Sequence, residues 1–214
     1  GTGAYVFAIV VLAVGIGMTT ALFSLVHAVL LQPLPFPNQN ALRVVWKALP
    51  GSPYAVELAY AEVEDLTEGI DVFESVAVLP TTPYANGRVV QGPGLEPVDV
   101  DTAPVSPDFF RTLGVTPMLG QDFPPSGDDE ARGPTVILSH DLWRGYFSAD
   151  RSIIGRKISI DGRAYGVRGV MGPSIDFPRR AKLWLLLSNS SAGRGGQWLQ
   201  AIARVVPGTS DEQV

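Results

Sequence analysis

The chain has 214 residues, contains no cysteine and carries a formal net charge of -5 at pH 7. The missing cysteines exclude disulfides, thiol catalysis and zinc or iron–sulfur sites built on cysteine, and the mild acidity argues against nucleic acid as a partner. All 16 Lys and Arg and all 21 Asp and Glu follow Leu42. An uncharged N-terminal part therefore precedes a charged remainder, which is long enough for one large domain or two small ones.

Residues 4–31 contain no Asp, Glu, Lys or Arg and are rich in Val, Leu, Ile, Ala and Phe. As a helix with a rise of ~1.5 Å per residue, they would extend about 42 Å, which exceeds the ~30 Å hydrocarbon core of a bilayer. The alternative is a secretory signal peptide, but its apolar region is shorter and follows basic residues, whereas the first charge here is Arg43. The sequence predicts a transmembrane helix over 4–31.

Small side chains recur along this helix. Ala13, Gly17 and Ala21 occupy every fourth position and therefore share one face, where a second backbone can approach closely. Other small or weakly polar residues widen the surface: Gly15, Thr19, Ser24 and Ala28. The pattern predicts packing against other membrane helices through Ala13, Gly17 and Ala21. The alternative is a face toward lipid, since Ala and Gly are common in any membrane helix.

Residues 32–41 are expected to form a proline-rich linker. Pro33, Pro35 and Pro37 stand at alternate positions, and each fixes φ and removes a backbone donor. The helix cannot continue through them, so the linker is a stiff exit from the membrane.

Strands and helices are expected to alternate after the linker. Strands are predicted at 43–48, 72–79 and 98–102, and helices at 59–70 and between Ser106 and Gly114. In the last of these strands Val98, Val100 and Thr102 alternate with aspartates, as in a strand with one wet face. Ser106 is the expected N-cap of the second helix, and Gly114 is expected to end it in the left-handed conformation. This order indicates a layered α/β or α+β fold.

More strands are expected in the second half of the chain. They are predicted at 135–138, 156–160, 163–171, 183–187 and 199–206. Ser139 is the expected N-cap of a short helix whose apolar residues between 142 and 147 belong to the core. Asp161 and Gly162 form the dipeptide that most favours a type I′ turn, because both turn positions require a positive φ. Two of the strands should therefore form a β-hairpin.

No set of side chains predicts catalysis or a cofactor. Ser139, His140 and Asp141 are adjacent, and neighbouring side chains at a helix start diverge, so they do not form a triad. His27 and His140 are the only histidines, which excludes a multi-histidine metal site. The acidic residues 128–130 lack calcium-loop spacing, and no phosphate-binding loop is present. The sequence thus predicts no enzyme, no metal and no cofactor in this chain.

Three segments carry a more specific signal: AVGIGMTTALFSLVHAVLLQPLPFPNQNALRVVW at 13–46, VSPDFFRTLGVTPMLGQDF at 105–123 and VILSHDLWRGYFSADRSIIGRKISIDGRAYGVRGVM at 136–171. Together they resemble MacB/FtsX-type ABC transporter permeases, in particular the duplicated permeases of Acidobacteria and relatives. The resemblance extends from Ala13 to Val205. Thr19 and His27 depart from it, since asparagines are expected at both positions.

The resemblance implies an α+β fold with one N-terminal transmembrane helix and an extracytoplasmic, porter-like α/β domain that carries a small β-rich insertion. The implied boundaries are a transmembrane helix at 4–31, a linker at 32–41, the porter-like part at 42–118 and 181–214, and the insertion at 119–180.

The resemblance also implies a mechanical role without catalysis. A partner ATPase on the cytoplasmic side binds ATP and drives the helices, and the outer domain moves to export or release a substrate of the macrolide, peptide or lipoprotein kind. The implied partners are this ATPase, the remaining helices of the same permease and, in some relatives, a second permease half, a periplasmic adaptor and an outer-membrane channel. The implied location is the bacterial inner membrane, with residues 42–214 on the periplasmic side.

Two other classes remain open. A membrane-anchored hydrolase would need an activated nucleophile, and the shortage of histidine argues against it. A single-span membrane-anchored binding module would have no further membrane helix. A permease would have three more, so the chain is expected to be a fragment whose parent sequence distinguishes these classes.

Overall fold

The computed structural model describes residues 1–30, 36–48, 51, 55–59, 62–63, 72–82, 87–125, 133–187 and 198–209. The chain divides into two compact units, 1–35 and 36–214, which are considered separately.

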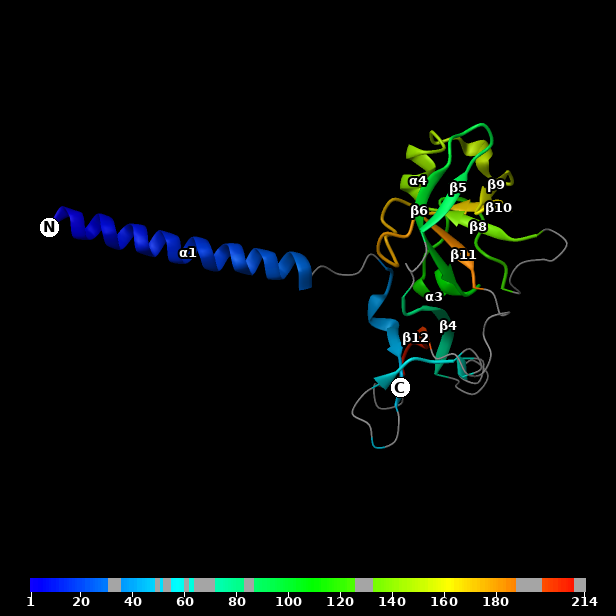
Figure 1. Cartoon of the computed structure of the whole chain (residues 1–214). Helices are drawn as coiled ribbons and strands as arrows, with labels where there is room; N and C mark the ends of the chain where they lie inside the picture. The colour runs from blue at the N-terminus through cyan, green and yellow to red at the C-terminus, as the bar shows by residue number, and fades with distance from the viewer. Residues whose placement is uncertain are drawn as a thin grey trace. The chain divides into compact units, whose positions relative to one another are not determined.

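The first unit is the helix α1, Thr2–Leu30, which confirms the predicted N-terminal helix (Figure 1). Its segment Thr2–Ser24 has a mean hydropathy of 2.5 and is long and apolar enough to cross a membrane. A helix pairs most of its backbone polar groups internally, which is what a segment in lipid requires.

A three-stranded antiparallel sheet begins the second unit. Its strands are β1 (Leu42–Val45), β12 (Leu199–Val205) and β4 (Phe73–Pro80), in the order β1-β12-β4. The short 3-10 helix η1 (Gln39–Ala41) precedes β1, and β2 (Lys47–Ala48) pairs separately with β3 (Ala55–Val56). Alternate residues of β4 and β12 belong to two different apolar clusters, so the sheet is buried on both faces.

The other strands form a seven-stranded sheet in the order β7-β10-β8-β11-β6-β5-β9. The strands are β5 (Gly87–Gln91), β6 (Val98–Val105), β7 (Leu119–Gly120), β8 (Thr135–Leu138), β9 (Lys157–Ile160), β10 (Arg163–Val170) and β11 (Leu183–Leu186). Because β9 pairs with both β5 and β10, six of them close into a ring, and only β7 lies outside it. Closure leaves these six strands without a free edge.

The ring joins strands from both sides of the predicted insertion boundaries. β5, β6 and β11 come from the part of the chain expected to be porter-like, and β8, β9 and β10 come from the expected insertion. β11 pairs with β6 on one side and with β8 on the other. The division at 119–180 stays a prediction, and these pairings run across it.

Three buried apolar clusters stabilise the described part of the unit. One, which includes Val76, Val78 and Ala201, lies on one face of the three-stranded sheet, and the other two are the larger cores. The first core lies between the three-stranded sheet, the ring and the short helix α3 (Phe109–Leu113). Its buried members include Ala77, Leu79, Ile202, Ala103, Trp184, Phe109 and Phe110. The second core lies around the ring and contains Val90, Val136, Ile158, Ile160 and Leu183, together with side chains from the helix α4 (His140–Gly145) and from η2 (Arg151–Ile153). Each fully buried Leu, Ile or Phe contributes about 1.5–3 kcal/mol through the area removed from water.

The predicted hairpin is confirmed. Asp161 and Gly162 join β9 to β10 with φ values of 49° and 81°, the positive values that a type I′ turn requires. The Asp161 carboxylate also accepts a hydrogen bond from the backbone N–H of Val89, at 2.9 Å, which connects the turn to β5.

Of the two predicted N-caps, one is confirmed and one is wrong. The Ser139 hydroxyl accepts a hydrogen bond from the Leu142 N–H, at 3.2 Å, and caps α4 as expected. The Ser106 hydroxyl instead accepts from the Val78 N–H, at 2.9 Å, and α3 has no side-chain cap. A buried backbone donor on β4 competes for this oxygen. The expected left-handed exit of α3 at Gly114 is confirmed, with φ of 74°.

Two predicted elements lie partly outside the described residues. Of the helix expected at 59–70, the structure describes 59 and 62–63, where the Val63 N–H donates to the Ala59 carbonyl. Most of the acidic loop, residues 126–132, is likewise outside them. The strand expected at 43–48 is interrupted at Trp46, which separates β1 from β2.

Candidate functional site

The residues at the start of α4 do not form a catalytic group. The Ser139 hydroxyl accepts the helix N–H of Leu142, and His140 Nδ1 lies 3.9 Å from the Asp141 carboxylate. Asp141 pairs instead with Lys182, at 3.2 Å. Within the described ranges, no three His, Asp or Glu side chains lie close enough together to hold a metal ion.

The predicted packing residues lie on α1. Ala13, Gly17 and Ala21 are exposed within the first unit, and a Cβ built on Gly17 would meet nothing within 4 Å. This face is therefore open to a second helix. Its use for packing stays a prediction.

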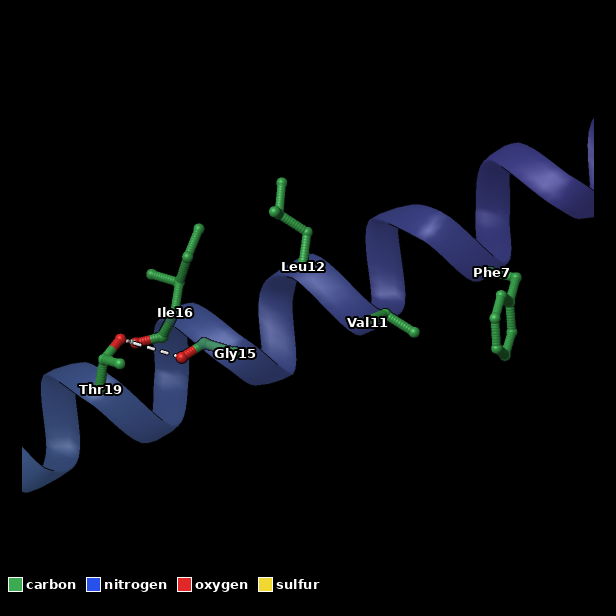
Figure 2. Close-up of a pocket in the computed structure, with 6 residues that line it drawn as sticks. All are labelled: Phe7, Val11, Leu12, Gly15, Ile16 and Thr19. Carbon is green, nitrogen blue, oxygen red and sulfur yellow. Dashed lines mark hydrogen bonds between the residues drawn. The ribbon is translucent and has the colours of Figure 1, made fainter.

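A second open face surrounds Gly15. Figure 2 shows a shallow hollow at this glycine, with Phe7 and Val11 toward one end of the helix and Thr19 toward the other; Leu12 and Ile16 complete the lining. At about 100° per residue, Gly15 and Gly17 are roughly 200° apart around the helix. Small residues thus lie on two nearly opposite sides of α1.

Thr19 does not make this hollow polar. Its hydroxyl donates to the carbonyls of Gly15, at 2.9 Å, and Ile16, at 3.0 Å, as the dashed lines in Figure 2 indicate. A hydroxyl that is satisfied within its own helix is compatible with an apolar surrounding.

The linker enters the second unit through a buried aromatic residue. Phe36 is 7% exposed and belongs to the first core. Its ring contacts Phe177 edge-on, with 5.6 Å between the centroids, and Phe177 stacks on Phe109 at 6.0 Å. Aromatic pairs in these arrangements are favourable beyond the area that they bury. The linker is thus attached to the interior of the domain.

Pro37, the next residue of the linker, faces the buried guanidinium of Arg204. Arg204 on β12 is 8% exposed, and its Nε donates to the carbonyl of Thr112 at 2.7 Å. Its Nη2 lies 3.5 Å from the carbonyl of Pro37, the long limit of a hydrogen bond. Among the described residues, no carboxylate forms an ion pair with Arg204.

Gly114 leaves room for this guanidinium. A Cβ at Gly114 would lie 2.8 Å from Arg204 Nη2 and 3.7 Å from the Pro37 carbonyl oxygen. We refer to Phe36, Pro37, Thr112, Gly114 and Arg204 together as the linker junction. Sequence reasoning missed it, because an arginine in a strand is usually a surface residue and one aromatic residue among prolines is a weak signal.

Two charged side chains, Asp122 and Arg168, lie close together just after the end of β7. Burial raises the pKa of Asp122 to about 6, although the Phe123 N–H donates to its carboxylate at 2.7 Å and Arg168 is nearby. Arg168 Nε donates to the backbone carbonyl of Asp122. This hydrogen bond ties β10 to the segment after β7.

Comparisons with known proteins agree with this architecture. The family described as MacB-like periplasmic core domain matches residues 5–214. Similar solved structures include the periplasmic region of MacB from Actinobacillus actinomycetemcomitans, with 13% identity and a TM-score of 0.58 over 83% of this chain and 82% of that one. Another is the extracellular domain of the noncanonic ABC-type transporter YknZ from Gram-positive bacteria, with 12% identity and a TM-score of 0.55 over 79% and 84%.

At these identities the structural likeness shows the fold alone. No curated protein matches the chain. The family match covers the helix α1 from Tyr5 onward and the whole second unit. The chain belongs to the family of MacB-like periplasmic core domains.

Proposed function

We propose that this chain is the outer, non-catalytic part of an ABC transporter permease and that it couples ATPase-driven helix motion to the export or release of a substrate. The observation that carries the proposal is the buried attachment of the linker that follows α1. Phe36 lies in the first core, so a displacement of the linker acts on the folded domain directly.

The described side chains support a mechanical role. The Ser139 hydroxyl is engaged as a helix cap, and the Asp141 carboxylate is engaged by Lys182. The sequence has no phosphate-binding loop, so ATP is bound by a partner ATPase on the cytoplasmic side. Calorimetric titration of the purified chain with Mg-ATP should give no saturable heat, and micromolar binding would contradict the partner-ATPase account.

The proposed location is the bacterial inner membrane, with the second unit on the periplasmic side. The further partners are the remaining helices of the permease and, where the assembly reaches the outer membrane, a second permease half, a periplasmic adaptor and an outer-membrane channel. The proposed substrate class is a macrolide, a peptide or a lipoprotein.

The alternative function is a single-span, membrane-anchored binding module. The sequence of the parent gene beyond Val214 separates the two, because three further apolar spans favour the permease. The functional test is ATP hydrolysis by the parent protein, purified from membranes with its ATPase and reconstituted in proteoliposomes. We expect ATP hydrolysis that vanadate inhibits. This activity should remain with the tagged parent protein throughout the purification. A parent protein that purifies as a single span without ATPase activity would overturn the proposal.

A further inference from the structure

The position of β1 makes it the first strand to receive a load from the membrane side. The linker leads through η1 into β1, and β1 pairs with β12 in the antiparallel direction, from Leu42 opposite Arg204 to Val45 opposite Ala201. β1 is an edge strand of its sheet, and it has four residues. A load that turns the linker away from the domain reaches the Leu42–Arg204 pair first. The pairs of such a strand would then open one after another.

The linker junction lies ahead of that first pair. Phe36 and Pro37 precede Leu42 in the chain, and both are attached to parts of the domain other than β1. Phe36 contacts Phe177, which follows the ring strand β10, and the Pro37 carbonyl faces Arg204 on the central strand β12. A load on the linker therefore meets these contacts before it reaches the hydrogen bonds of β1.

Hydrogen bonding to two separate segments explains an arginine at position 204 better than packing in the core does. A buried cation is costly, and an apolar side chain of similar size packs at least as well, so packing alone does not explain an arginine here. Its guanidinium instead reaches two carbonyls from separate segments, Thr112 at the end of α3 and Pro37 in the linker. Hydrogen bonds from a charged donor are stronger than neutral ones and depend on direction. Gly114, without a Cβ, leaves the space that this arrangement needs.

We infer that the linker junction is a mechanical attachment point, in which Phe36 and Arg204 transfer force from the membrane-side linker into the first core and prevent β1 from separating from β12. The inference rests on the proposed function, since it assumes that the linker is pulled. Arg204 acts as a positioning residue that holds the Pro37 carbonyl against the end of α3.

The test is to load the whole chain through two different points. The chain has no cysteine, so two cysteines introduced as handles for optical tweezers react selectively. In the first geometry, Gln32→Cys and Arg151→Cys bring the load in through the linker. In the second geometry, Glu74→Cys and Arg151→Cys load β4 and leave the linker slack. Glu74 and Arg151 are exposed, so neither handle disturbs the core.

Arg204→Met removes the charged donors and keeps a long side chain, and Phe36→Leu removes the aromatic contact and keeps an apolar one. With either change we expect the first opening event under a fixed load to become at least about tenfold faster in the linker geometry, which corresponds to about 1.4 kcal/mol in the barrier. In the β4 geometry the rate should change by less than about threefold, or about 0.7 kcal/mol. Ile158→Val, in the ring core, is the matched control and should affect both geometries alike.

Two results would overturn the inference. Equal acceleration in both geometries would mean that Phe36 and Arg204 are ordinary core residues. Unchanged rates in the linker geometry would mean that the junction carries no load. Neither result depends on transport or on ATP, so a failure here leaves the permease assignment intact, and a failure of that assignment would be seen in the proteoliposome measurement instead.

Discussion

Gly120 offers the sharpest test of the packing between β7 and β10. Its φ is 76°, and a Cβ on it would lie 2.2 Å from the backbone oxygen of Arg168 and 3.0 Å from the Cα of Gly169. Both obstacles are backbone atoms of a paired strand, which cannot move aside as a flexible side chain can. Gly120→Ala therefore combines an unfavourable φ with a steric conflict.

Gly162 provides the matched comparison. Its φ is 81°, but a Cβ there would meet nothing within 4 Å, so Gly162→Ala introduces only the unfavourable φ. The left-handed conformation costs an L-residue about 1–2 kcal/mol, and the loss of freedom in the unfolded chain offsets roughly half of it. We expect Gly162→Ala to lower stability by about 1 kcal/mol. Overpacking adds about 1–3 kcal/mol, so Gly120→Ala should lower it by about 2–4 kcal/mol.

Thermal and urea unfolding of the whole chain in detergent would measure both effects. Trp143 and Trp184 are buried and serve as fluorescence probes of the second unit. For a domain of this size, each 1 kcal/mol corresponds to a change of about 2–4 °C in Tm, so we expect losses of about 2–4 °C for Gly162→Ala and about 4–16 °C for Gly120→Ala. Equal losses would refute the reasoning, because the steric conflict at β10 would then cost nothing.

Three further predictions concern the helix, a titrating group and a misassigned cap. In the parent permease, Gly17→Leu should leave membrane insertion intact but weaken cross-linking between helices and export, whereas the control Val11→Leu should not; equal behaviour would favour a lipid-facing tether. Asp122 has a pKa of about 6 in the folded protein against 3.8 as the ordinary value, so the folded state binds the extra proton and stability should fall as pH rises from about 4 to about 6. Asp122→Asn should flatten this dependence in Tm measured between pH 4 and 7, and an unchanged slope would contradict the assignment. Ser106→Ala should cost about 1–3 kcal/mol in urea unfolding, because the Val78 N–H loses its acceptor. Ser152→Ala should cost less, because it removes only an exposed hydroxyl that donates to the Asp150 carboxylate.

The elements that sequence reasoning predicted correctly are those specified by short stretches of chain. The turn at Asp161 and Gly162 depends on two residues that tolerate a positive φ, and α1 depends on a long uncharged run. The cap at Ser139 likewise involves an N–H only three residues away. In each case the decisive interaction lies inside a window that can be inspected without knowing the fold.

The features that were missed involve partners far apart in the chain. The ring closes because β9 pairs with β5 as well as with its hairpin neighbour β10, and Asp161 reaches the backbone of Val89, 72 residues away. Arg204 reaches the carbonyl of Thr112, 92 residues away. Ser106 was expected to accept a hydrogen bond from the helix that follows it, but its hydroxyl accepts instead from the N–H of Val78 on β4, 28 residues away. Such choices depend on which segments the two cores bring together, and no local pattern contains that information.

The separation of the two cores bears on how the domain would respond to a pull. The first core contains Phe36 together with Ala77 of β4 and Trp184 of β11, so it connects the linker to both sheets. The second core lies with the ring, and none of the described linker residues, 36–41, belongs to it. A load that enters at Phe36 would thus be shared between the sheets through the first core, while the ring keeps its own closed hydrogen bonding. Motion is therefore expected to occur between the ring and the three-stranded sheet, where side chains from α3 fill the space, and the pairings inside the ring should be the last to open.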